Sequence, residues 1–281
     1  MKPTNPIPLF YWSERKFIFK DKENYGDLLS KYLVEKISGR EVKFVQPKKQ
    51  PWYKFNKNNY LAIGSILPHA TKDSIVWGSG IIDRKHQIAK ADFRAVRGPH
   101  TRKFLLDTGH SCPEVYGDPA LLLPLYFYPE VEKAYKIGII PHYHDYQLAV
   151  KMYAENKDIL VIDMMTLDVE EVTRKILSCE KTISSSLHGL IISHAYKIPG
   201  IWVEFSNKIF GDGVKYPDYL ESVAIPVYKP EFLQHKKSLR ELENLVKEKP
   251  NLPKAEKIKE VQDGLMKSCP FLYNLEDSRF I

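Results

Sequence analysis

The sequence has few cysteines and no long hydrophobic run, and each deficit excludes a class of protein. Its 281 residues include three cysteines, Cys112, Cys179 and Cys269, which lie far apart and show no paired spacing. This pattern predicts buried, unlinked thiols and not a disulfide framework. The longest nearly apolar run, 120–128, is about half as long as a transmembrane helix, and the first residues show no signal-peptide pattern. We therefore expect a cytoplasmic protein.

Several functional motifs are also missing from the sequence. It contains no GxxxxGK[ST] loop for ATP hydrolysis and no GxSxG nucleophile elbow, although serines lie beside a histidine at 184–188. His142, His144 and Asp145 resemble part of a metal site, but no further ligands with suitable placement can be identified, so we expect no metal. No basic helix or aromatic-studded sheet has the spacing of a nucleic-acid reader, so we expect no nucleic-acid partner.

The positive charge is concentrated near the N-terminus. The chain carries 42 basic and 35 acidic residues, and its first 60 residues hold 13 basic and 6 acidic ones, so the whole excess of seven lies there. Such a stretch favours an anionic ligand or an anionic membrane surface, because opposite charges attract. A solvated surface without a partner is the alternative.

Short apolar segments alternate with helical patterns along most of the chain. Two series of strands are predicted, at 8–12, 41–45, 59–65, 74–80 and 93–97, and then at 136–142, 159–163, 182–185 and 200–204. Helices are predicted at 28–37, 101–106, 146–155, 169–178 and 188–196. This alternation predicts an α/β fold with mostly parallel sheets. We expect one Rossmann-like domain at 1–128, a second at 129–230, and a charged helical segment at 231–281 that packs on the body.

Site candidates follow the strands, because ligands of open parallel sheets bind beyond the carboxyl ends of the strands. Gly78, Ser79 and Gly80 follow one strand and would let backbone N–H groups approach an anion; an ordinary turn is the alternative. Arg97 follows the next strand, and its planar fork suits a carboxylate or a phosphate. It could equally tie down a loop by bonding carbonyls or an aspartate.

The segment 184–190 is the most informative in the chain. Its serines, including Ser185 and Ser186, end a strand, and His188 and Gly189 begin a helix. A helix N-terminus offers free N–H groups and partial positive charge to an anion. A histidine side chain can accept and donate a proton in general acid–base catalysis. A buried structural histidine is the alternative, which its place beside the expected crevice disfavours.

Eight short segments, taken together, resemble the polysaccharide pyruvyltransferases, and particularly the bacterial members that modify exopolysaccharides. They occur in the family's order between about residues 24 and 222. They are NYGDL (24–28), AIGSIL (62–67), VWGSG (76–80), VRGP (96–99), GDPAL (117–121), IPHY (140–143), SSLHG (185–189) and KYPDYL (215–220).

The resemblance implies a GT-B-like fold of two domains that face a cleft, and a reaction without a cofactor. Phosphoenolpyruvate would be the donor and a sugar with two hydroxyls the acceptor, giving a pyruvate ketal and phosphate. Arg97 and His188 would act as catalytic residues. Arg97 would hold the donor's phosphate or carboxylate, and His188 would serve as general acid or bind the phosphate. Further donor-binding residues would be Gly78, Ser79, Gly80, Ser185, Ser186 and Gly189. Acceptor-binding residues would be Asn24, Asp27, His142 and Lys215.

Two other functions share this architecture. One is a glycosyltransferase that uses a nucleotide sugar, and the other is a non-catalytic relative that acts as a binding subunit. Fold alone does not separate the three. A lipid-linked acceptor would give the basic N-terminal stretch a reason to lie at the inner face of the membrane, as a peripheral protein.

Overall fold

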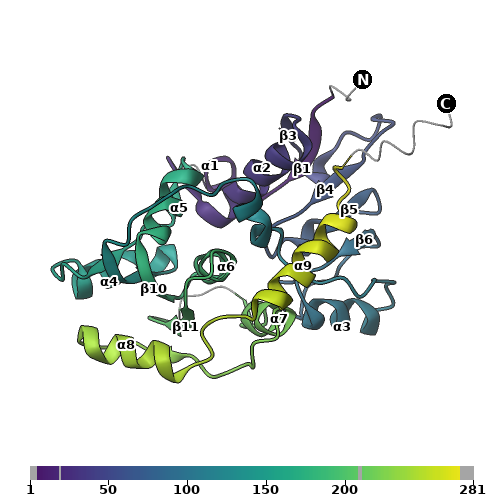
Figure 1. Ribbon diagram of the computed structural model, residues 1–281. Coiled ribbons are helices and arrows are strands. Elements are labelled where there is room, and N and C mark those ends of the chain that lie inside the picture. Colours follow the sequence, from purple (N-terminus) through teal and green to yellow (C-terminus); the bar gives the residue numbers. More distant parts are fainter. Residues whose placement is uncertain (1–4, 19, 208–210, 273–281) are drawn as a thin grey trace.

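Two parallel β-sheets form the centre of the protein in the computed structural model, which describes residues 5–18, 20–207 and 211–272 (Figure 1). The first sheet has five strands in the order β3-β1-β4-β5-β6, all parallel. They are β1 (Ile7–Phe10), β3 (Val42–Phe44), β4 (Asn59–Leu61), β5 (Ser74–Trp77) and β6 (Asp92–Ala95). Each predicted strand of the first series is confirmed, although the observed strands are shorter because their small and polar ends form loops.

The second sheet repeats this design. Its five strands run parallel in the order β12-β11-β10-β7-β8, with β10 at the centre. They are β7 (Tyr135–Ile140), β8 (Ile159–Val161), β10 (Cys179–Ser184), β11 (Gly200–Glu204) and β12 (Glu231–Phe232). The expectation that the chain is helical from residue 231 is wrong at its start, because 231–232 pairs with β11 as an edge strand.

Helices connect the strands, and those at 28–37, 101–106, 146–155, 169–178 and 188–196 were predicted from the sequence. The helices are α1 (Glu14–Phe17), α2 (Tyr25–Ser38), α3 (Pro99–Asp107), α4 (Tyr146–Tyr153), α5 (Val169–Leu177), α6 (Leu187–Ala195) and α7 (Lys215–Ser222). Side chains cap several of them: Asn24 accepts from Gly26 N at the start of α2, and Asp168 accepts from Glu170 N and Glu171 N at the start of α5. Short 3-10 helices lie at η1 (Pro47–Lys49), η2 (Leu67–His69), η3 (Pro119–Leu125) and η4 (Tyr143–Asp145).

The last two helices pack on different halves of the molecule. Helix α8 (Leu239–Glu248) lies against β7 and β10 of the second sheet. Helix α9 (Ala255–Lys267) crosses to the first half, where Leu265 O accepts a hydrogen bond of 2.9 Å from Trp77 Nε1. Figure 1 shows this crossing, with α9 beside β5 and α8 at the far end of the second sheet. Helices α8 and α9 together thus contact both halves of the molecule.

The two halves also share side chains. One hydrophobic core contains Leu29 of α2, Leu121 of η3 and Leu190 of α6, all fully buried. The short strands β2 (Glu23–Asn24) and β9 (Met165–Thr166) pair antiparallel across the two halves. Because this contact brings residue 24 next to the second half, α2 begins where both halves meet.

Candidate functional site

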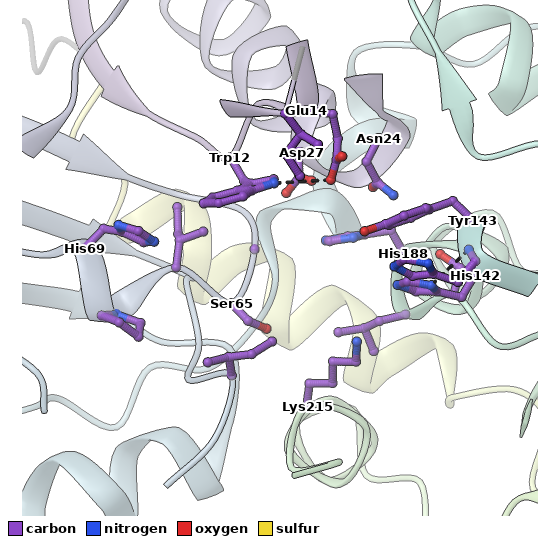
Figure 2. Close-up of a pocket in the computed structure, with 18 of the residues that line it drawn as sticks. Trp12, Glu14, Asn24, Asp27, Ser65, His69, His142, Tyr143, His188 and Lys215 are labelled. Atoms are coloured by element: carbon purple, nitrogen blue, oxygen red, sulfur yellow. Dashed lines mark hydrogen bonds between the residues drawn. The ribbon is translucent and has the colours of Figure 1, made fainter. Parts of the chain in front are cut away.

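A cavity of about 550 Å³ lies where the two halves meet (Figure 2). The first half lines it with Trp12, Glu14, Ile18, Asn24, Asp27, Gly64, Ser65, Ile66, Pro68, His69, Ile82 and His86. The second half lines it with His142, Tyr143, His144, Ser186, Leu187, His188 and Lys215. Most of these residues follow a strand or begin a helix, as expected for a ligand site of parallel sheets.

His188 lies in the first turn of α6, whose N-cap Ser186 accepts from Gly189 N. The ring packs so closely on α2 that a Cβ atom at Gly26 would lie 1.9 Å from His188 Nδ1. Its other nitrogen, Nε2, lies 3.6 Å from Asp118 Oδ2, and neither atom has a hydrogen-bond partner among the described residues. This separation permits an ion pair but is too long for a hydrogen bond. Three elements, α2, α6 and η3, therefore fix the imidazole.

Asp118 was not among the predicted site residues, although it lies in the GDPAL segment. It is fully buried, and its Oδ1 accepts from Ala120 N at 3.0 Å as the N-cap of η3. Oδ1 is thus used in capping η3, whereas Oδ2 is turned toward His188. A buried carboxylate beside an imidazole stabilises the protonated ring.

Carboxylates gather on the wall that the first half contributes. Burial, and then the charges of Glu14 and Glu23, raise the pKa of Asp27 to about 8, while Lys215 opposes this rise. Glu14 is itself buried and pairs with Lys20 at 2.9 Å, and its Oε1 accepts from Trp12 Nε1 at 3.2 Å. Asp27 therefore holds its proton near neutral pH, which is unusual for a carboxylic acid.

Nitrogen bases gather on the opposite wall. Burial lowers the pKa of Lys215 to about 8, and the charge of Arg97 adds to this effect while Asp27 opposes it. Burial also lowers the pKa of His142 to about 3, with further contributions from Lys215, His144 and Lys20. His142 is therefore a neutral ring at physiological pH, whereas Lys215 keeps most of its charge. In Figure 2, Lys215 and Asp27 reach into the cavity from opposite sides.

Arg97 lies behind the cavity wall and has no exposed surface. Its Nε donates to Asp218 Oδ2 at 3.0 Å, its Nη2 to Ile81 O at 2.8 Å and its Nη1 to Ser65 Oγ at 2.6 Å. Only Ser65 of these partners lines the cavity. This geometry matches the alternative in which the arginine ties loops together, and direct contact with a ligand stays a prediction.

The segment from Gly78 to Gly80 is buried and does not line the cavity. A Cβ atom at Gly80 would lie 2.4 Å from Arg97 Cζ, and one at Gly78, whose φ is +88°, would lie 2.3 Å from Pro119 Cδ. Ser79 Oγ donates to Gly64 O at 2.8 Å. These residues make room for groups of the protein itself, as in the ordinary-turn alternative.

The predicted site residues divide into two sets. The structure brings six of them together at the cavity: Asn24, Asp27, His142, Ser186, His188 and Lys215. Ser185 and Gly189 are buried behind it, where Ser185 Oγ accepts from His142 N at 2.9 Å. The sequence analysis missed Trp12, Glu14 and Tyr143, although Trp12 and Glu14 follow β1 at the edge of the sheet where the other candidates were sought.

Among the residues that the structure describes, no group of three or more His, Cys, Asp or Glu side chains is arranged to hold a metal ion. No helix in these described parts is long and apolar enough to cross a membrane.

A cavity lined by titratable side chains at the carboxyl ends of parallel strands is the usual place of a ligand site in an α/β protein. In comparison with known families, residues 24–207 match the profile of the polysaccharide pyruvyl transferases. The chain therefore belongs to the polysaccharide pyruvyl transferase family. It is a transferase, of a family that acts in pyruvyl transfer to polysaccharide.

Two known proteins are similar to the chain in sequence. The uncharacterized protein L143 of Acanthamoeba polyphaga mimivirus is 32% identical over 212 residues, which cover 72% of this chain and 71% of the relative. The succinoglycan biosynthesis protein ExoV of Rhizobium meliloti (strain 1021) is 26% identical over 173 residues, which cover 59% of this chain and 52% of the relative.

Replacing Arg97 by Ala should strongly destabilise the protein, because the buried carboxylate of Asp218 would lose its cation. We expect the free energy of unfolding, measured by urea denaturation, to fall by about 3–5 kcal/mol. Arg94→Ala is the matched control: it removes an exposed ion pair with Asp92 and should cost less than about 1 kcal/mol. Wild-type stability combined with a lost affinity for an anionic ligand would contradict this structural role.

Replacing Asp27 by Asn should change how stability depends on pH. Folding raises the pKa of Asp27 from its ordinary value of 3.8 to about 8, so the folded state retains a proton that the unfolded state releases in this range. The wild type should therefore lose stability relative to Asp27→Asn as the pH rises from 4 to 8.

Urea denaturation of both proteins across this pH range measures the difference. Asp21→Asn, at an exposed position, is the control and should follow the wild-type curve. Parallel curves for wild type and Asp27→Asn would contradict the raised pKa.

Proposed function

We propose that the protein transfers the enolpyruvyl group of phosphoenolpyruvate to two hydroxyls of a sugar in a surface polysaccharide or exopolysaccharide precursor. The products are a pyruvate ketal and phosphate. The observation that carries the proposal is the meeting of His188, Asp27 and Lys215 at one cavity, each from a different element. Family membership supports pyruvyl transfer in general, and these side chains supply the groups that this particular donor and product require.

The donor carries two anionic groups, so it needs cations or oriented N–H groups. Lys215 is the cation of this wall that reaches into the cavity, and we assign it to the donor, although the sequence placed it with the acceptor. The N-terminus of α6, with Ser186 and His188, offers further N–H groups and positive potential. Burial disfavours the charged form of Lys215, and an anion bound beside this side chain would favour that form again.

The first chemical step is protonation of the donor's methylene carbon. His188 supplies this proton, and Asp118 stabilises the imidazolium that must be present beforehand. Because Nε2 faces Asp118, the proton comes from Nδ1, the nitrogen beside Gly26. Protonation leaves a positively charged centre on the carbon that carries the phosphate ester, and a sugar hydroxyl attacks it.

The hydroxyls must lose their protons for the ketal to form. Asp27 is placed to accept the proton of the attacking hydroxyl in the fraction of molecules in which it is ionised, a fraction that grows as the pH approaches 8. Its raised pKa makes this ionised form a stronger base than an ordinary carboxylate. A second hydroxyl then displaces phosphate. Two hydroxyl protons are released in total: one replaces the proton given to the methylene carbon, and the other leaves with phosphate.

The acceptor sugar lies against the remaining wall of the cavity. Trp12 and Tyr143 offer aromatic surfaces, and Asn24 and the neutral ring of His142 offer hydrogen-bonding groups. A few polar groups on an apolar wall are typical of small-molecule sites. We propose that the acceptor is a sugar or a lipid-linked oligosaccharide, which the protein meets in the cytoplasm at the inner face of a membrane.

Phosphoenolpyruvate should raise the melting temperature of the purified protein, because it binds the folded state alone. At roughly a hundredfold excess over Kd the gain is about 2.7 kcal/mol, and it should disappear in Lys215→Ala. UDP- and GDP-sugars are the control ligands and should give no shift. Stabilisation by a nucleotide sugar alone would point instead to a glycosyltransferase, and no stabilisation by any of them to a non-catalytic relative.

Gly26→Ala should abolish most of the activity while leaving His188 in the chain. The added methyl group would occupy the position of the ring and displace it, so we expect kcat to fall about 10²–10⁴-fold. Phosphate release from phosphoenolpyruvate and acceptor measures kcat, and circular dichroism checks the fold. Gly264→Ala in α9, where a Cβ atom meets nothing closer than 3.7 Å, is the matched control. Normal turnover by Gly26→Ala would refute the proton role of His188.

A further inference from the structure

The loop that joins β3 to β4, residues 47–58, presents three large aromatic side chains to solvent. Trp52 is 88% exposed, Tyr53 67% and Phe55 106%, all within four residues (the loop follows β3 in Figure 1). Single exposed hydrophobic residues are ordinary, but a cluster of this kind marks an interaction surface. The catalytic proposal uses none of the three.

The loop has a defined shape. A turn at its tip is closed by a hydrogen bond of 3.2 Å from Lys54 N to Pro51 O, and Gln50 Nε2 spans the loop to Lys57 O at 2.8 Å. The rings of Trp52 and Tyr53 meet edge to face, with their centroids 6.0 Å apart. The loop thus holds the aromatic side chains outward at its tip. No aromatic residue of the tip is needed to fill a core.

Lysines surround these aromatic rings. Residues 42–72 contain six lysines and no Asp or Glu, and Lys48, Lys49 and Lys54 are exposed in the loop itself. Within the part of the chain that the structure describes, none of these three pairs with a carboxylate; Lys54 Nζ donates to the neutral Gln50 Oε1 at 2.6 Å. The positive charge of the loop is therefore free to meet an external anion.

We propose that loop 47–58 docks the protein on an anionic membrane surface. Trp and Tyr rings favour the interface between water and hydrocarbon, and lysines beside them favour anionic headgroups. A protein partner is disfavoured, because lysine is depleted in protein interfaces. A protruding tip also differs from the basic groove in which proteins hold single-stranded nucleic acid.

The loop also lies near the cavity. Burial, and next the charge of Lys48, lower the pKa of His69, which lines the cavity. Docking would therefore bring the cavity toward the surface at which a lipid-linked acceptor resides. The access to a lipid-linked acceptor rests on the proposed function, whereas the docking itself depends on the loop alone.

Co-sedimentation with vesicles tests the docking. The full chain should bind vesicles of phosphatidylcholine and phosphatidylserine, and bind pure phosphatidylcholine at least tenfold more weakly. Binding should weaken as salt rises from 0.1 M to 1 M, since the screening length falls from about 10 Å to about 3 Å. The triple variant Trp52→Ala, Tyr53→Ala, Phe55→Ala and the variant Lys48→Gln, Lys49→Gln, Lys54→Gln should each lose at least tenfold in affinity.

Matched controls carry the same kinds of change elsewhere on the surface. Leu125→Ala, Tyr128→Ala, Leu167→Ala replaces exposed apolar residues, and Lys151→Gln, Lys157→Gln replaces exposed lysines. Both controls should bind as the wild type does. Because the loop residues are exposed, their variants should keep the wild-type melting temperature. Trp52→Phe should still bind vesicles, but the blue shift of tryptophan fluorescence that accompanies binding should be lost.

Absence of wild-type binding to anionic vesicles, or equal binding by the loop variants, would overturn the proposal. The proposal would also be overturned if the loop variants kept wild-type vesicle binding but lost self-association or the binding of single-stranded DNA. Stabilisation by phosphoenolpyruvate, measured on the same proteins, is independent of the loop. If the protein binds phosphoenolpyruvate but no vesicles, the proposed transfer reaction stands and the docking proposal is wrong. If it binds vesicles but not phosphoenolpyruvate, only the proposed reaction is wrong.

Discussion

The buried ion pair between Arg97 and Asp218 is the contact on which the cavity depends. Arg97 follows β6 in the first half and Asp218 lies in α7 of the second, and neither side chain has exposed surface. Asp218 also accepts from Thr101 N and Thr101 Oγ1, so it holds the start of α3 as well. Two buried charges are tolerated only where their hydrogen-bonding groups are satisfied, as here.

Close packing around this pair extends its influence to the site. A Cβ atom at Gly98 would lie 1.9 Å from Asp218 O, so the backbones of the two halves touch. Arg97 reaches Ser65 on one side, and Lys215 lies one turn before Asp218 on α7 on the other. The buried pair thus holds together the segments that bring Ser65 and Lys215 to the cavity, although Arg97 itself remains behind the wall.

The sequence predicted features that depend on neighbouring residues. Parallel strands, the capping of α5 by Asp168 and the start of α6 beside His188 all follow from local patterns. The resemblance to the family located Asn24, Asp27 and His142, and the rule that sites follow strand ends would have located Trp12 had it been applied to β1. Features that depend on distant partners were not predictable in this way.

Arg97 illustrates the limit. Its sequence context is the same whether it contacts a ligand or an aspartate 121 residues away, and only the fold brings Asp218 within 3.0 Å. Gly80 is a second example. A glycine at this position could make room for a bound anion or for the guanidinium of Arg97, and the local sequence is the same in both cases. The pairing of β2 with β9 is also hidden, since each strand has two residues and therefore no detectable period.

The environment of His188 ties the proposed chemistry to this packing. The ring is held between Gly26 of α2 and Asp118 of η3, and both elements contact α6. Its Nε2 and Asp118 Oδ2 are buried without hydrogen-bond partners in the described structure, 3.6 Å apart, so a shift of less than about 1 Å would create a charge-assisted hydrogen bond. An Nε2–H group would donate this bond, and a second proton on Nδ1 gives the charged ring that the proposed reaction uses; an anionic donor at the α6 N-terminus would favour this charged ring. In the proposed reaction, donor binding and the charging of the general acid therefore reinforce each other.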